Sequence, residues 1–279
     1  MRTRYFLAAM GLASLTFGSI HPVAAQADDD QSWLRQCQRD SYGWGSDNEH
    51  VCEIRHSGFK PTGTTLSIDP DENGGAEIIG WDKDSVAVTA RIQANAPSED
   101  EARELAQQIK INGSGSSISV DGPSTGRHEG WGVILVVMVP RKSGIDAETV
   151  NGPLSVENLS GTIDLRAENG PVAIENVGGD VRARVQNGPL DVTLTGTKWE
   201  GKGLDAESVN GPVSLQIPQK YNAELETGTV NGPMTVNMPL TVTLKGRVTD
   251  RIHTTLGAGG APIRVVTTNG PLTIQSARD

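Results

Sequence analysis

Residues 151–153 read NGP, and the same tripeptide returns at 169–171, 187–189, 210–212, 231–233 and 269–271. Asn-Gly between alternating strands normally indicates a tight β-hairpin, which is closed by an N–H on the residue after the Gly. Pro lacks that N–H, but it is tolerated as the first residue of a strand. The tripeptide therefore predicts a corner that leads into a new strand rather than a two-residue hairpin.

Apolar residues hold fixed positions around each Asn of the tripeptide. The third residue after it is always apolar, and so is the fifth: Leu154, Val172, Leu190, Val213, Met234 and Leu272, then Val156, Ile174, Val192, Leu215, Val236 and Ile274. The sixth residue before it is also apolar: Ile145, Ile163, Val181, Leu204, Leu225 and Ile263. The fifth before it is charged: Asp146, Asp164, Arg182, Asp205, Glu226 and Arg264. This period of two predicts strands with one buried and one charged face.

The spacings between successive Asn residues, 18, 18, 23, 21 and 38, indicate stacked two-stranded repeats. We predict a parallel β-solenoid of about seven rungs, with ~4.8 Å between rungs. Each copy is expected to lie on its predecessor, and the stretch 246–262 is expected to be a degenerate rung. The corner residues are expected to adopt positive φ, and the Asn side chains to bond one another up the stack. They are Asn151, Gly152, Asn169, Gly170, Asn187, Gly188, Asn210, Gly211, Asn231, Gly232, Asn269 and Gly270.

The first 27 residues have the layout of a secretory signal peptide. Arg2 and Arg4 precede an apolar stretch over 5–20, and AQA at 25–27 provides a cleavage site after residue 25 or 27. The apolar stretch is too short for a stable membrane span. We therefore expect a periplasmic or extracellular protein with no integral membrane segment after cleavage.

Cys37 and Cys52 are the two cysteines of the chain. In an exported protein they predict one disulfide that closes a short polar loop. A metal site with His50 and His56 is the alternative, but the spacing does not match a zinc ribbon or finger. The formal net charge of −10 becomes more negative once Arg2 and Arg4 are removed, and this argues against nucleic acid and anionic lipid as partners.

Residues 28–143 lack the repeat and are expected to form a small α+β cap on the solenoid of residues 144–279. Strand patterns occur at 64–68, 76–81, 85–94, 116–120 and 131–139. Between them, residues 97–109 predict a helix with Ser98 as N-cap and Glu101 closing a capping box. A cap of this kind covers the open edge of a first rung.

Several of these features together resemble the bacterial putative-adhesin family of unknown function. They are the signal peptide, the early Cys pair, GWD at 80–82, SEDEARELA at 98–106, VP at 139–140 and the recurring VNGP and GG turns. The resemblance covers most of the mature chain. It implies an exported or envelope β-solenoid, and it carries no catalytic motif.

A catalytic set is not evident in the sequence. The residues His50, His56, His128 and His253 are scattered, and GSGSS at 113–117 lacks the frame of a nucleophile elbow or a phosphate loop. Stacking is expected to place Asp164 beside Arg182 and Glu148 beside Arg166, as a solvated sheet requires. No catalytic, cofactor or metal residues are therefore assigned.

Trp199 is the candidate binding residue. It lies in the insertion TKWEGKG at 197–203, where it could stack on a sugar or protein partner or fold back over a corner. The sequence thus predicts an exported, non-enzymatic β-solenoid that acts as a binding, adhesin-like or scaffold module for a protein or glycan at the cell envelope. The alternative is a β-helical lyase or hydrolase that acts on polysaccharides.

Overall fold

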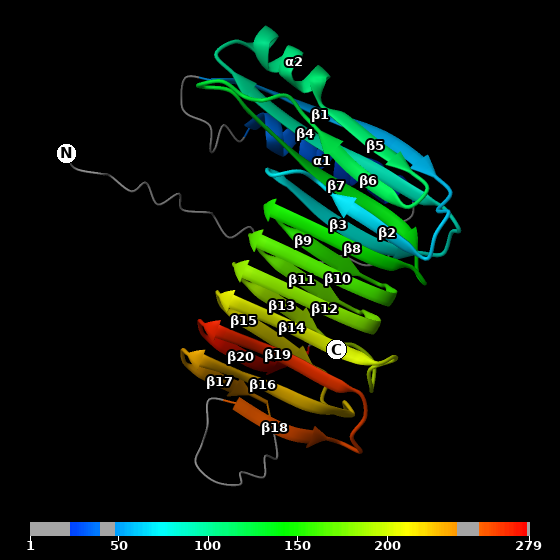
Figure 1. Ribbon diagram of the computed structural model, residues 1–279, viewed down its shortest axis with the longest axis vertical. Helices are drawn as coiled ribbons and strands as arrows, with labels where there is room; N and C mark the ends of the chain where they lie inside the picture. The colour runs from blue at the N-terminus through cyan, green and yellow to red at the C-terminus, as the bar shows by residue number, and fades with distance from the viewer. Residues whose placement is uncertain (1–22, 40–47, 239–250, 278–279) are drawn as a thin grey trace, which may run out of the picture. The chain divides into compact units, whose positions relative to one another are not determined.

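The computed structural model describes residues 23–39, 48–238 and 251–277, and this part of the chain is mainly β (Figure 1). Its helices are α1 (Val23–Arg39) and α2 (Glu99–Gln108). The strands before the repeats are β1 (Glu49–Phe59), β2 (Thr65–Asp69), β3 (Gly74–Trp81), β4 (Val86–Ala96), β5 (Lys110–Ser114), β6 (Ser117–Asp121) and β7 (Gly130–Pro140). The remaining strands are β8 (Gly144–Asn151), β9 (Leu154–Glu157), β10 (Ser160–Asn169), β11 (Val172–Glu175), β12 (Gly178–Asn187), β13 (Leu190–Thr193), β14 (Gly203–Asn210), β15 (Val213–Ile217), β16 (Ala223–Asn231), β17 (Met234–Asn237), β18 (Arg251–Leu256), β19 (Pro262–Asn269) and β20 (Leu272–Ser276).

The described chain divides into two compact units, each assembled from several segments. The smaller unit holds the described residues up to Ile54 together with Ile92–Gln108 and Pro123–Trp131. In it, a disulfide joins Cys37 of α1 to Cys52 of β1, as the sequence predicts. Helix α2 begins after Ser98, whose hydroxyl accepts a hydrogen bond from the N–H of Glu101 and donates one to its carboxylate.

The five strand patterns before residue 143 are all strands in the structure, namely β2, β3, β4, β6 and β7. Strands β1 and β5 and helix α1 are additional elements. The predicted signal peptide lies mostly outside the described residues, and 23–27 belong to α1, so this segment and the linear boundary at residue 143 stay predictions. Within the larger unit, β2 pairs in parallel with β8 and β3 with β9, so strands on both sides of that boundary share the same sheets.

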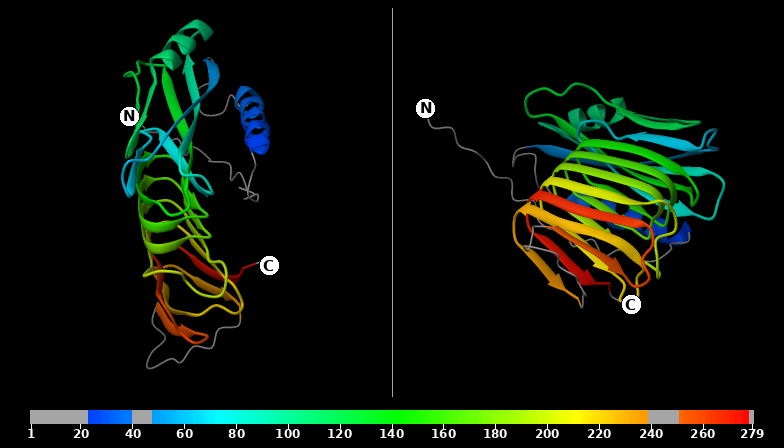
Figure 2. Two further views of the ribbon diagram at one scale, coloured as in Figure 1. Left: turned by 90° about the vertical axis from the view of Figure 1, so that its right-hand side faces the viewer. Right: turned by 60° about the horizontal axis from the view of Figure 1, so that its bottom comes forward.

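The described strands form two sheets, and all the strands of the NGP repeats belong to the larger unit (Figures 1 and 2). Sheet A has the order β1-β4-β7-β3-β9-β11-β13-β15-β20-β17, and sheet B has the order β18-β16-β19-β14-β12-β10-β8-β2-β6-β5. Each repeat unit, defined as the strand that ends at an NGP Asn and the strand after the Pro, contributes one strand to each sheet. Parallel pairs occur together with the antiparallel pairs β16–β18 and β5–β6, so the architecture is not a purely parallel solenoid, and the number of rungs stays a prediction.

The repeat units pair in parallel and in register, as the pattern predicts. Ile163 lies beside Val181, and Val172 beside Leu190. Val156, Ile174 and Val192 are at most 2 % exposed, which fits the burial of alternate side chains between the sheets. The last strand of sheet A departs from this, because Val236 of β17 is 38 % exposed.

The order of the last repeat units along the two sheets differs from their order in the sequence. Strand β19 lies between β14 and β16, and β20 lies between β15 and β17 (Figure 1). The C-terminal unit is therefore inserted between two earlier units and is not the end of the stack. The prediction of a degenerate rung at 246–262 is also wrong for residues 251–262, because β18 runs antiparallel to β16. Residues 246–250 lie outside the described residues.

The expected positive φ at the NGP corners is wrong. Among the described residues, positive φ occurs at other positions, including Asn158 (57°) and Asn176 (48°), and at none of the six NGP Asn or Gly residues. These glycines are required by close packing instead. A Cβ on Gly170 would lie 2.0 Å from the carbonyl oxygen of Gly152, and a Cβ on Gly188 would lie 2.0 Å from that of Gly170.

The backbone hydrogen bonds at the NGP corners join neighbouring repeat units and do not close the turn within one repeat unit. The N–H of Gly170 donates to Asn187 O, and that of Val172 donates to Pro189 O. The missing N–H of Pro is therefore not needed to close the corner. The Asn side chains form the expected ladder, with Nδ2 to Oδ1 distances of 2.8–3.1 Å in the order Asn151, Asn169, Asn187, Asn210, Asn269 and Asn231.

Candidate functional site

A row of charged side chains crosses the outer face of sheet B. We call this row the outer ladder. Because neighbouring strands are in register, one residue from each strand falls in the same row across the sheet. From β16 to β8 the row is Glu226, Arg264, Asp205, Arg182, Asp164 and Asp146. The signs alternate over the first five residues, which limits repulsion between neighbouring strands.

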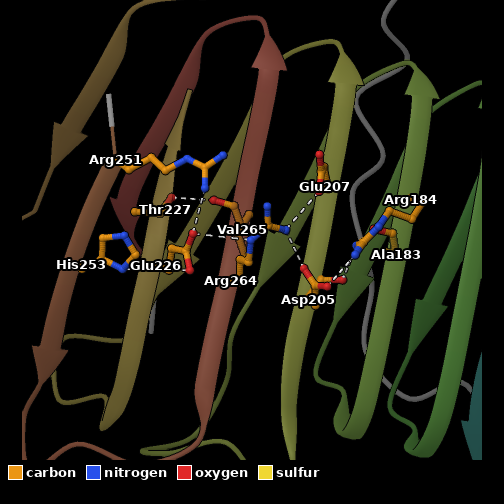
Figure 3. A network of polar contacts seen from close by, with 10 residues as sticks. All are labelled: Ala183, Arg184, Asp205, Glu207, Glu226, Thr227, Arg251, His253, Arg264 and Val265. Carbon is orange, nitrogen blue, oxygen red and sulfur yellow. Dashed lines mark hydrogen bonds and ion pairs between the residues drawn. The ribbon is translucent and has the colours of Figure 1, made fainter. Parts of the chain in front are cut away.

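Arg264 on β19 connects the strands on both sides of it (Figure 3). Its Nη1 lies 2.7 Å from Asp205 Oδ1 and 3.1 Å from Glu207 Oε2 on β14. Its Nε lies 3.5 Å from Glu226 Oε1 on β16. Burial by itself lowers the pKa of Arg264, but the hydrogen bonds and charges of Asp205 and Glu207 together raise it.

Asp205 is bound from two sides. Besides Arg264, it accepts a hydrogen bond from Arg184 Nη2 on β12 at 2.5 Å (Figure 3). Burial raises the pKa of Asp205, but the two arginines outweigh this and hold the pKa below its ordinary value. Both Asp205 and Arg264 are thus stabilised in their ionised forms.

Arg166 on β10 also binds several acidic side chains, farther along sheet B. It lies 2.9 Å from Asp146, 2.7 Å from Asp164 and 3.9 Å from Glu148. The register places Asp164 beside Arg182 and Arg166 beside Glu148, as predicted. The short contacts, however, are those that Arg166 makes with the two Asp residues, and this explains how Asp146 and Asp164 can be neighbours.

Strand β18 adds polar and ionisable side chains at the edge of the ladder. Arg251 Nη1 is 3.3 Å from Glu226 Oε1, and His253 Nδ1 is 4.0 Å from Glu226 Oε2 (Figure 3). The hydroxyl of Thr255 donates to Glu224 at 2.9 Å. These contacts were not predicted, because an antiparallel strand outside the repeat pattern supplies them. The stretch R-I-H-T-T at 251–255 carries no NGP, so the repeat pattern does not identify it.

A groove of about 850 Å³ crosses this face over β12, β14, β19, β16 and β18. Its ionisable lining residues are Asp180, Arg182, Lys202, Asp205, Glu224, Glu226, His253 and Arg264. Lys202 Nζ lies 3.1 Å from Asp180. Among the described residues, no ion pair to the exposed Arg182 is found, because Asp164 and Asp205 beside it bind other arginines. Arg182 is thus the cation of the groove that is open to a partner.

Asp205 and Arg264 of the outer ladder, and Arg166 beside it, are poorly suited to proton transfer. A general acid or base works best when its pKa lies near the ambient pH. The pKa of Asp205 is lowered and the pKa values of Arg166 and Arg264 are raised, so each moves away from neutrality. No group of three or more His, Cys, Asp or Glu residues that could hold a metal is present in the described part of the chain.

Trp199, the candidate binding residue, is folded back and is 6 % exposed. Its indole Nε1 donates to Gly179 O at 3.0 Å. Of the two roles considered for it, the structure therefore favours shielding of a corner. GSGSS at 113–117 lies at the antiparallel turn between β5 and β6, and His56 and His253 lie on separate strands, β1 and β18.

The GWD and VP motifs have structural roles in the larger unit. Trp81 Nε1 donates to Ser85 O at 2.8 Å, and a Cβ on Gly80 would lie 2.0 Å from Asn158 O. Arg141, which follows the VP motif, binds Asp82 with Nε to Oδ1 at 2.6 Å. That hydrogen bond lowers the pKa of Asp82. These motifs thus fix the first strands of the stack.

The chain has structural similarity to solved bacterial proteins. One is a putative cell adhesion protein from Clostridium sporogenes, with 9 % identity, a TM-score of 0.42, and coverage of 81 % of this chain and 100 % of that chain. Another is a putative adhesin from Bacteroides fragilis, with 14 % identity, a TM-score of 0.31, and coverage of 81 % and 97 %. No curated protein matches the sequence. The model of the Toastrack DUF4097 family matches residues 106–275, more than half of the sequence, and the chain therefore belongs to this family.

Proposed function

We propose that the protein is an exported, non-enzymatic β-solenoid that binds a protein or glycan at the bacterial cell envelope, as an adhesin-like or scaffold module. The observation that carries the proposal is the outer ladder with the groove beside it. Stacked strands hold its charged groups at fixed spacings of ~4.8 Å. A rigid, extended array of this kind suits recognition of an extended partner.

Charge pairing on this face supports binding over catalysis. Asp205 and Arg264 are fixed by several ion pairs, with pKa values displaced away from neutrality. Arg182 is exposed beside them, and a guanidinium presents five N–H donors in a planar fork that suits carboxylates. We therefore expect Arg182 to contact the partner.

Export is supported by two features of the chain. The disulfide between Cys37 and Cys52 is typical of oxidising compartments such as the periplasm. The N-terminal sequence has the layout of a signal peptide. In the described residues, no helix has the length and apolar character to cross a membrane.

The proposal is tested by retention of a partner on the immobilised, exported protein. The probes are a solubilised envelope fraction and an array of acidic and neutral glycans. We expect a partner that the wild type retains and Arg182→Glu loses. Lys142→Glu is the matched control, because Lys142 is exposed, does not line the groove and undergoes the same change of charge. Equal retention by both variants would place binding elsewhere.

The second candidate is a polysaccharide lyase or hydrolase, which the groove favours because carboxylates and His253 converge in it. Its test is incubation of the purified protein with acidic polysaccharides, followed by size analysis of the products. We expect intact polymer. Cleavage that is lost in Glu226→Gln would overturn the non-enzymatic assignment.

A further inference from the structure

The position of the C-terminal unit in the stack is out of sequence order. Strands β14 and β15 form one wall of a slot, and β16 and β17 form the other (Figure 1). The pair β19–β20 fills this slot, although both walls come earlier in the chain. The slot is therefore completed by a segment that follows both walls in the sequence.

The contacts in the slot are those of any repeat unit. Asn269 donates to Asn210 and accepts from Asn231, both at 2.8 Å. Val213 N–H donates to Pro271 O at 2.9 Å, and Leu272 N–H donates to Pro233 O at 3.0 Å. Ile263, Val265, Leu272 and Ile274 are at most 1 % exposed. The slot thus fits a strand pair with the NGP pattern.

The charges of the walls select which strand pair fits. Asp205 on one wall and Glu226 on the other both face the row that Arg264 occupies. Direct pairing of β14 with β16 in this register would place the two carboxylates side by side, which is destabilising. Arg264 binds both of them. The walls therefore disfavour closing on each other and favour a strand with a cation at this position.

A glycine-rich connection at 257–261 joins β18 to the inserted strand. Gly257, Gly259 and Gly260 have φ values of 53°, 77° and 157°, which other residues rarely adopt. The fold thus contains a segment, β19–β20, with its own binding slot and a short connection before it. This is the arrangement from which identical elements can be exchanged between copies.

We propose that the slot between β14–β15 and β16–β17 accepts the C-terminal repeat, residues 262–276, of a second copy of this chain. The swapped assembly retains every contact of the inserted unit and changes only the path of residues 257–261. The swapped assembly forms at high protein concentration. Insertion within one chain has an effective concentration that does not depend on the protein concentration, whereas exchange between two copies increases with it. This inference does not rest on the proposed function.

Disulfide trapping in the full chain tests the proposal. Asn237 on β17 lies beside Gln275 on β20, so Asn237→Cys with Gln275→Cys reports which copy fills the slot. The control is Thr193→Cys with Gln216→Cys, which are paired in the same way on β13 and β15 but belong to units in sequence order. After incubation at high concentration in mild denaturant, dilution and oxidation, we expect a shift from monomer to covalent dimer on non-reducing gels for the first pair alone.

Monomer for both pairs at every concentration would overturn the proposal, and so would equal amounts of dimer for both, which would indicate random oxidation. A second measurement uses no cysteine substitution. Tagged and untagged wild-type chains are mixed under the same conditions, and the untagged chain is expected to co-purify with the tagged one. Its absence from the eluate contradicts the exchange.

Discussion

Each repeat unit turns at two corners, and the corners use asparagine in different ways. At the NGP corner, all six Asn residues lack positive φ, and their side chains form one continuous ladder. At the second corner, which we define as residues 157–160 and 175–178, Asn158 and Asn176 have φ values of 57° and 48°. There the ladder is short, because Thr195 donates to Asn176 and no Asn follows it.

The difference shows what each corner requires from the sequence. The NGP corner is determined by its neighbours, since the stacked backbone leaves no room for a Cβ on its glycine. The second corner depends on an Asn that adopts the left-handed conformation by itself. The insertion 197–203 follows Thr195, in the next copy of the second corner. An insertion is tolerated where the corner is not part of a continuous ladder.

Replacement of Gly188 is expected to have the largest effect. In Gly188→Ala the new Cβ would lie 2.0 Å from Gly170 O, and relief of this overlap must move two stacked corners, so we expect a loss of about 3 kcal/mol in the free energy of unfolding. Denaturant titration measures it. The control is Gly196→Ala, where φ is 71° and no atom lies within 4 Å of the new Cβ, with an expected loss of about 1 kcal/mol. Equal losses would mean that backbone contact does not determine the NGP corner.

Asn176→Ala tests the second corner. The substitution places Ala at a φ of 48° and removes the hydrogen bonds with Asn158 and Thr195, so we expect a loss of about 2 kcal/mol. Asn176→Gly removes the same hydrogen bonds but accepts the positive φ. It should therefore be more stable than the Ala variant in thermal unfolding, and the reverse order would contradict the assigned role of conformation at this corner.

The sequence was sufficient to predict the strands, their register and the buried faces of the repeats, because these depend on a period of two around each NGP. It was not sufficient to predict the order of the last units. Each unit carries the same apolar and Asn-Gly pattern, so any unit can stack on any other without a change of register. The signal that distinguishes them is charge, since Arg264 fits between Asp205 and Glu226, whereas sequence order would place the two acids together.

The reason for the glycines also depends on tertiary structure. Asn-Gly has a local preference for positive φ, and the close approach of Gly152 to Gly170 arises only when two units stack. The alternation of charges on sheet B was predictable for Asp164 and Arg182. The contribution of Arg251 and His253 was not, because β18 lies outside the repeat and pairs antiparallel.

Asn187→Ala removes a central member of the Asn ladder. Asn187 donates to Asn169 at 3.0 Å and accepts from Asn210 at 2.9 Å, and its exposure limits the expected loss to about 1 kcal/mol. Asn187→Gly should be no more stable than the Ala variant, because φ is not positive at this position. Equilibrium unfolding of both variants checks this. A clear advantage for Gly, as expected at residue 176, would remove the distinction between the corners.

Glu175→Gln is expected to have the smallest effect, and it should stabilise the protein. Glu175 is the first residue of the second corner and lies directly beside Glu157. Burial, and then the charge of Glu157, raise the pKa of Glu175 above the ordinary value of 4.5. A raised carboxyl pKa means that the folded state holds the proton more tightly, so the wild type loses stability as the pH rises from below 4.5 through the raised pKa. The Gln variant lacks this loss and should be more stable by about 0.3 kcal/mol at neutral pH. The gain should disappear in acid, where Glu175 is protonated, so a gain that is constant across a pH series of unfolding curves would mean that the stacked carboxylates are not its cause.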